Sequence, residues 1–195
     1  MDLQPEVSLR RFRELGVQDI DEMLNPYRQL GVFHDLEMGL VGREEFVARL
    51  NEHAGTDLTD EQVNEAIMLF LKGVPQYKFD YLEQLRKEYK IYILSNTNPY
   101  IMAYAHSPHF LPATGRTLSD YVDKVYASCE MQTMKPDRAI YEQMIADSGM
   151  VPERTLFIDD STANIEAAAA LGLQTLLAVN ATDWRPALAA RLQCD

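Results

Sequence analysis

Two adjacent acids follow a short apolar run in the last third of the chain. The run is Leu156, Phe157 and Ile158, and the acids are Asp159 and Asp160. Such a run can be buried on both faces, as a strand of a parallel sheet must be, and ligands bind where such strands end. Two carboxylates at one strand end are costly unless they are neutralised, and a hard cation such as Mg²⁺ is the usual solution. The pair therefore indicates a magnesium site, or else one acid that caps the next helix and one that faces solvent.

Three further polar residues stand at comparable places. Ser95 and Asn96 follow the apolar run 91–94, and Lys135 stands just before Pro136, a favoured first residue of a helix. Each has an ordinary explanation, because Ser and Asn form turns and a single Lys is most often a solvated charge. Taken with the acids, they supply a hydroxyl and an amide for phosphoryl oxygens, an ammonium to neutralise them, and carboxylates for Mg²⁺. The set predicts a combined phosphate and metal site.

Strand and helix patterns alternate through the second part of the chain. Strands are predicted at 91–94, 124–128, 155–158 and 174–179, and helices at 81–89, 136–149, 164–172 and 186–192. The stretch 103–117 contains prolines and a glycine and is predicted to be the end of a helix and a loop. The alternation predicts an α/β fold with a doubly wound, Rossmann-like parallel sheet.

The first part of the chain has helical spacing and no strand pattern. Helices are predicted at 5–15, 19–24, 36–50 and from Thr59 through Leu71, where Thr59 and Gln62 form a capping box and Gly73 with Pro75 closes the helix. This part is predicted to be an all-helical layer, a small bundle that covers another part of the protein.

Composition narrows the classes of function. The chain has 195 residues, of which 47% are hydrophobic, so it can bury a substantial core. Its net charge of -12 argues against nucleic acid as a partner, because no basic cluster is present to displace phosphate counterions. It has neither an apolar run of 18 residues nor a signal-peptide pattern. We therefore predict a soluble, cytoplasmic protein with no membrane partner, in which Cys129 and Cys194 are reduced thiols.

Three segments carry a resemblance to a known family. ILSNTN, MKPD and FIDDSTAN, in this order, resemble the second, third and fourth motifs of the haloacid dehalogenase superfamily, and specifically its epoxide-hydrolase-phosphatase-like bacterial members. The resemblance covers nearly the whole chain. It implies a helical cap at residues 1–75 on an α/β core at residues 76–195.

The resemblance also implies an activity. Most members are Mg²⁺-dependent phosphohydrolases, so we expect a phosphomonoesterase of a small phosphorylated metabolite, as a monomer or homodimer. Ser95 and Asn96 would bind the substrate phosphate, and Lys135 would bind it and stabilise a phosphoaspartate, which makes Ser95 and Lys135 the catalytic candidates.

The same resemblance assigns the metal residues. Asp160 would bind Mg²⁺ directly, while Asp159 and Asn164 would lie in the water shell of the metal. The cofactor that the resemblance implies is thus Mg²⁺.

The first motif of the family does not match. It is a nucleophilic Asp at the end of the first, central strand, followed two residues later by a second acid. No apolar strand precedes Asp2, and position 4 is Gln4, so Asp2 is not predicted to be the nucleophile. We therefore expect the first central strand to be absent and the chain to be a truncated, inactive phosphatase. The alternative is a non-catalytic binding or interaction protein with a vestigial phosphate and metal pocket.

A receiver-type signalling domain is a third functional hypothesis, because that fold also uses acids and a Lys at strand ends. The helical region before the sheet argues against it. In the resembled family the nucleophile strand lies between the strands at 91–94 and 156–158. Without it, these strands are expected to lie about 10 Å apart or to pair directly, with their polar ends on one rim.

Overall fold

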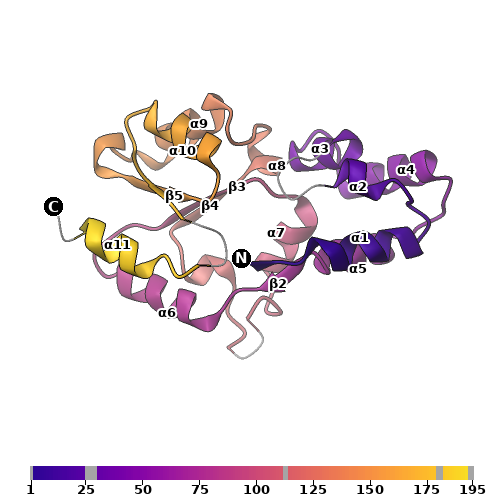
Figure 1. Ribbon diagram of the computed structural model, residues 1–195, viewed down its shortest axis with the longest axis horizontal. Helices are drawn as coiled ribbons and strands as arrows, with labels where there is room; N and C mark the ends of the chain where they lie inside the picture. The colour runs from indigo at the N-terminus through magenta and orange to yellow at the C-terminus, as the bar shows by residue number, and fades with distance from the viewer. Residues whose placement is uncertain (1, 25–29, 112–113, 179–181, 193–195) are drawn as a thin grey trace. The chain divides into compact units, whose positions relative to one another are not determined.

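The computed structural model of the protein describes residues 2–24, 30–111, 114–178 and 182–192 (Figure 1). The chain forms two compact units, Met1–Met134 and Lys135–Asp195, which are described separately below. None of the helices in the described ranges is long and apolar enough to cross a membrane.

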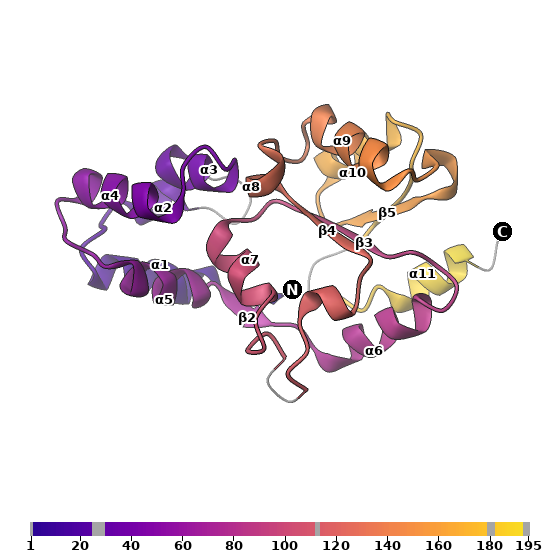
Figure 2. The same ribbon diagram turned by 180° about the vertical axis from the view of Figure 1, so that it is seen from behind.

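Five helices open the first unit. They are α1 (Pro5–Glu14), α2 (Ile20–Met23), α3 (Gly31–Glu37), α4 (Arg43–Ala54) and α5 (Asp60–Met68). Helix α4 ends at Gly55, whose φ of 65° suits a residue without Cβ, and α5 begins at the predicted capping box of Thr59 and Gln62. Helices α1 and α5 lie side by side (Figures 1 and 2). The predicted start of α5 at Thr59 is therefore confirmed, whereas α4 runs to Ala54, past the predicted helix end at residue 50.

A row of aromatic rings forms the centre of this helical layer. Phe12, Phe33, Phe46 and Tyr100 contact one another edge to face, with successive ring centroids 5.6, 4.9 and 6.1 Å apart. All four side chains are buried. Tyr100 belongs to α7 (Pro99–Ala105), so the helical layer shares its hydrophobic core with the helix that follows Ser95.

Two predictions for this region were wrong. The predicted helix 36–50 is two helices, because the chain between α3 and α4 turns at Gly39, where φ is 65°. The predicted helix from Thr59 through Leu71 ends at Met68, and β2 (Leu71–Gly73) pairs antiparallel with β1 (Asp2–Leu3). Strands this short show no alternation of apolar and polar residues, so the all-helical prediction missed them.

The rest of the first unit carries a parallel strand pair. Its elements are α6 (Gln76–Leu85), β3 (Tyr92–Ser95), α7, the short 3₁₀ helix η1 (Leu118–Asp120), β4 (Lys124–Ala127) and α8 (Ser128–Met131). Strands β3 and β4 pair in parallel, with Ser95 opposite Ala127. The predicted strands at 91–94 and 124–128 are confirmed, whereas the helix predicted at 81–89 begins and ends earlier, as α6.

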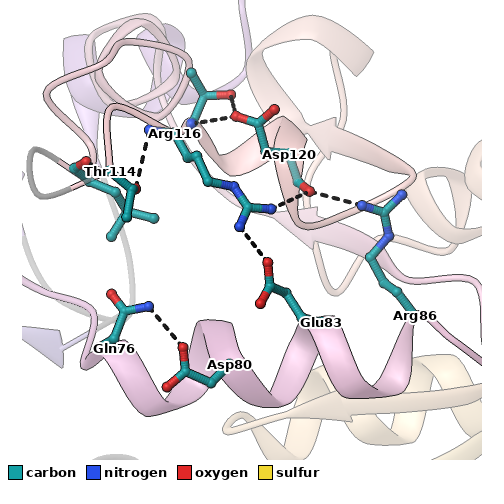
Figure 3. Close-up of polar contacts among 9 residues, drawn as sticks. Gln76, Asp80, Glu83, Arg86, Thr114, Arg116 and Asp120 are labelled. Carbon is teal, nitrogen blue, oxygen red and sulfur yellow. Dashed lines mark hydrogen bonds and ion pairs between the residues drawn. The ribbon is translucent and has the colours of Figure 1, made fainter.

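Two arginines fasten the loop between α7 and β4 to α6. Arg86, which directly follows α6, and Arg116 of the loop both donate to the backbone carbonyl of Asp120, at 2.9 and 3.3 Å (Figure 3). Arg116 also pairs with Glu83 of α6, and the carboxylate of Asp120 accepts from both the backbone amide and the hydroxyl of Thr117. These contacts give a defined course to a segment that was predicted as a loop.

The second unit alternates helices with a second parallel strand pair. Its elements are α9 (Arg138–Ser148), the 3₁₀ helix η2 (Pro152–Arg154), β5 (Leu156–Asp159), α10 (Thr162–Ala169), β6 (Gln174–Leu177) and α11 (Arg185–Leu192). Strands β5 and β6 pair in parallel, as predicted. In both views α9 and α10 lie above β5, and α11 lies below it (Figures 1 and 2). Val179, at the end of the predicted last strand, and Cys194 lie outside the described residues.

Pro136 does not take the helical position that the sequence predicts. Helix α9 begins two residues later, at Arg138, and the side chain of Asp137 caps it by accepting from the amide of Ala139 at 2.9 Å. The Lys135–Pro136 peptide bond is cis. Lys135 therefore precedes the helix in a turn rather than at a helix start.

The two parallel pairs, with helices between their strands, confirm the Rossmann-like α/β class. The predicted boundary between cap and core, near residue 75, stays a prediction. The expected separation of strands 91–94 and 156–158 concerns the two different units and also stays a prediction.

One prediction follows from the packing of α3 against α8. Burial raises the pKa of the half-buried Glu37 carboxyl to about 7, from an ordinary value of 4.5. The folded protein then binds this proton more tightly than the unfolded chain, so stability is lost as pH rises from about 4.5 to 7 and stays lost above that range. Glu37→Gln should therefore raise the free energy of unfolding at pH 8, by up to about 3 kcal/mol, and change it much less at pH 5.

Urea unfolding at the two pH values measures this difference. Glu130→Gln is the matched control, because Glu130 lies on α8 but is exposed. The prediction would be contradicted if both variants changed the free energy of unfolding equally. It would also be contradicted if Glu37→Gln raised that free energy by the same amount at pH 5 and pH 8.

Candidate phosphate and metal site

A buried ion pair lies at the end of β5. The Nζ atom of Lys135 donates to Oδ2 of Asp159 at 2.7 Å, and the two side chains are only 11% and 7% exposed. The ammonium also lies 5.7 Å from the ring centroid of Phe157. A buried pair of this kind is tolerated only when its remaining hydrogen-bonding capacity is satisfied.

The second oxygen of Asp159 is also occupied. Its Oδ1 atom accepts from the backbone amide of Ser161 at 2.9 Å and from the side-chain amide of Asn164 at 2.8 Å. The carboxylate thus receives three hydrogen bonds, one of them from an ammonium. Asp159 therefore orients Lys135 and Asn164, and both of its oxygens are engaged within the protein.

Asp160 differs from Asp159 in its surroundings. Its side chain is exposed, and within the described residues nothing hydrogen-bonds or ion-pairs with its carboxylate. No three His, Cys, Asp or Glu side chains of the described ranges are grouped closely enough to hold a metal ion. Mg²⁺ commonly takes one or two protein carboxylates and fills its other positions with water and substrate phosphate. Asp160 fits such a site as one ligand, whereas both oxygens of Asp159 already accept hydrogen bonds within the protein.

The turn after β3 is fixed at both of its ends. The backbone amide of Thr97 donates to Oγ of Ser128 at 2.9 Å, and that hydroxyl donates to the carbonyl of Thr97 at 3.1 Å. The side-chain oxygen of Asn98 accepts from the first amides of α7, at 3.1 and 3.2 Å. Ser95 is half-buried at the head of this turn, and its hydroxyl makes a long contact of 3.4 Å with the carbonyl of Asn96.

The predicted site residues thus fall into two groups. Lys135, Asp159 and Asn164 contact one another within the second unit, with Asp160 adjacent in sequence. Ser95 and Asn96 belong to the first unit, so their part in a shared site stays a prediction, as do the individual roles of all six residues.

Sequence reasoning missed two residues that hold these groups in place. Ser128 directly follows β4, much as Ser95 ends β3, and this position at a strand end was its available signal. Tyr141, whose hydroxyl donates to the backbone carbonyl of Asn164 at 3.1 Å, gave no signal, because it reads as an ordinary apolar position of a helix.

Comparison with known proteins identifies relatives over almost the full length of the chain. D-ribitol-5-phosphate phosphatase of Bacteroides thetaiotaomicron is 39% identical over 188 residues, which are 96% of this chain and 91% of that protein. Pyrimidine 5'-nucleotidase PynA of Streptococcus pneumoniae is 29% identical over 194 residues, which cover 90% of this chain and 76% of that protein.

Solved structures show the same relationship. A HAD-like hydrolase of Porphyromonas gingivalis superimposes with a TM-score of 0.93 at 48% identity, covering 99% of this chain and 92% of that one. A HAD family enzyme of Bacteroides thetaiotaomicron, crystallised as an aspartate-to-alanine mutant with magnesium and inorganic phosphate, gives 0.90 at 33% identity over 96% and 92% of the two chains. A family model described as haloacid dehalogenase-like hydrolase matches residues 7–172. The chain belongs to the haloacid dehalogenase-like hydrolases.

Proposed function

We propose that this protein is a magnesium-dependent phosphomonoesterase of a small phosphorylated metabolite. The observation that carries the proposal is the Lys135–Asp159–Asn164 network next in sequence to Asp160, whose carboxylate has no partner among the described residues, in a chain of this hydrolase family. The names of two relatives offer two substrate classes, a pentitol phosphate and a pyrimidine 5'-nucleotide. The net charge of -12 favours a small substrate over nucleic acid.

Each polar residue then has a chemical role. Asp160 binds Mg²⁺, which when bound neutralises negative charge on the phosphoryl oxygens. The ammonium of Lys135 carries three donors, of which Asp159 takes one, and its charge stabilises the phosphoryl group. The hydroxyl of Ser95 and the amide of Asn96 donate to phosphoryl oxygens.

We also propose a subgroup and a role for the N-terminal region. The protein belongs to the epoxide-hydrolase-phosphatase-like subgroup, and residues 1–75 form a helical cap whose side chains select the substrate. We propose a cytoplasmic monomer or homodimer.

The nucleophile is the part of the mechanism that residues 1–195 leave unassigned. No Asp in an Asp-x-Asp pattern follows an apolar strand in the printed sequence, and Asp2 lies in the two-residue strand β1. We therefore propose that these 195 residues do not turn over substrate by themselves. The same observation favours a second candidate, a binding protein that keeps the phosphate and metal residues without the chemistry.

An assay of phosphate release distinguishes the phosphomonoesterase from the binding protein. The substrates are D-ribitol 5-phosphate, a pyrimidine 5'-nucleotide and p-nitrophenyl phosphate, each assayed with and without Mg²⁺. We expect no release above background from residues 1–195, and Mg²⁺-dependent release once an apolar strand that ends in Asp-x-Asp is fused in front. In the fused protein, Asp160→Asn should lower the rate of phosphate release by about 100-fold or more. Removing a direct metal ligand should reduce activity at least as much as removing a residue that only contacts a ligand.

Glu166→Gln is the control for that substitution, since Glu166 is an exposed acid on α10. If the fused protein binds phosphate and Mg²⁺ yet releases no phosphate, the binding protein is the correct candidate. Activity of the 195-residue chain that Asp2→Ala abolishes would show that Asp2 is the nucleophile after all.

A further inference from the structure

Tyr141 combines complete burial with a directed hydrogen bond. It lies on α9, its side chain is 0% exposed, and its ring meets Phe157 edge to face with centroids 5.5 Å apart. Its hydroxyl donates to the backbone carbonyl of Asn164 at 3.1 Å.

This hydrogen bond closes a ring of contacts around the candidate site. Asn164 donates from its side chain to Asp159, and Asp159 accepts from Lys135. Lys135 in turn lies on the segment that leads into α9, the helix that carries Tyr141. Lys135 and Asp159 are therefore joined twice, by their ion pair and by the path through Tyr141 and Asn164.

The start of α10 depends on this contact because its own cap is weak. Ser161, the residue before α10, makes no side-chain hydrogen bond to the first turn, so the helix lacks the usual side-chain acceptor at that end. Asn164 is the third residue of the helix. A hydroxyl that holds its carbonyl from α9 restrains the first turn and, with it, the direction of the Asn164 side chain.

We propose that the Tyr141 hydroxyl is a positioning group, which holds Asn164 so that Asp159 and the neighbouring Asp160 are presented in one fixed arrangement. The part of this inference that concerns Mg²⁺ rests on the proposed function, whereas the part that concerns Asp159 does not. A phenylalanine would fill the same space, so packing alone does not require the hydroxyl.

Tyr141→Phe tests the proposal in metal-free protein first. The amide of Ser161 donates to Asp159, so its hydrogen exchange reports how firmly Asp159 is held. We expect this exchange to become about tenfold faster. The amide of Ala178, which bonds to the backbone carbonyl of Asp159, should exchange unchanged, since a merely structural loss would affect both amides. Tyr121→Phe is the control, because Tyr121 is equally buried but lies in the first unit.

Mg²⁺ binding, measured by calorimetry, gives the second readout. Tyr141→Phe should raise the dissociation constant about 3- to 10-fold, and adding it to Asn164→Ala should change the constant no further, because its effect passes through the Asn164 side chain. Unchanged exchange at Ser161, equal acceleration at Ala178, or additive losses in the double variant would overturn the proposal. If the wild-type protein binds no Mg²⁺, the proposed function fails, and the exchange result still decides the role of Tyr141.

Discussion

Lys135→Met should lower the free energy of unfolding of the second unit by about 3 to 5 kcal/mol. The substitution keeps most of the side-chain volume but leaves the carboxylate of Asp159, which is 7% exposed, without its counter-ion. Two hydrogen bonds to the other oxygen of Asp159 remain, from Ser161 and Asn164, and they do not supply a full positive charge. Urea unfolding at pH 7 measures the loss.

Arg138→Met is the matched control for this prediction. Arg138 pairs with Glu142 at 2.7 Å, but the two side chains are 66% and 52% exposed, so its removal should cost only a few tenths of a kcal/mol. Removing both buried charges, as Lys135→Met with Asp159→Leu, should recover much of the loss, because no unpaired charge then remains. A Lys135→Met protein as stable as the Arg138→Met protein would show that the pair at the end of β5 is not buried in solution.

Gly39→Ala should also be strongly destabilising, by about 3 kcal/mol or more. Two costs add at this position. The φ of 65° carries a penalty of about 1 to 2 kcal/mol for a residue with Cβ, and a Cβ built here would lie 2.0 Å from the backbone carbonyl oxygen of Cys129. Because the obstructing atom belongs to the backbone, it cannot rotate away, and α3 and α8 must move apart.

Gly55→Ala separates the two costs. Gly55 has the same φ of 65°, and a Cβ there meets nothing within 4 Å, so it carries the conformational penalty alone. We expect the thermal unfolding midpoint to fall clearly further for Gly39→Ala than for Gly55→Ala. Equal shifts would mean that α3 and α8 pack more loosely than the structure indicates.

The sequence by itself determined the α/β class, most of the strands and the family. Short apolar runs ending in small polar or acidic residues located β3, β4 and β5 to within one or two residues, because the apolar runs of parallel strands have a local signature. The Thr59 capping box located the start of α5 for a similar reason, since both partners lie within one turn of helix. The three motifs, in order, indicated the family that the relatives then established.

Several elements differ from their local sequence patterns because of contacts that only the tertiary structure shows. The pairing of β1 with β2 joins segments about 70 residues apart, and strands of two and three residues have no stability or pattern of their own. The predicted helix 36–50 divides at Gly39, where both the φ of 65° and the close approach to the backbone of Cys129 on α8 require a residue without Cβ, and only the φ has a local signal in the sequence. Helix α9 begins after Pro136, later than predicted, because Asp137 caps its first turn.

The candidate site shows the same division between local and long-range information. The sequence indicated which residues have the right chemistry, and it grouped Asp159 with Asp160 as metal residues. In the structure the two acids have different surroundings. Both carboxylate oxygens of Asp159 accept hydrogen bonds, from Lys135, Ser161 and Asn164, whereas the side chain of Asp160 is exposed. Asp159 is the last residue of β5, whereas Asp160 lies beyond the strand, so the two side chains meet different surroundings. Those surroundings, including Tyr141, are set by packing between helices, which a single sequence does not reveal.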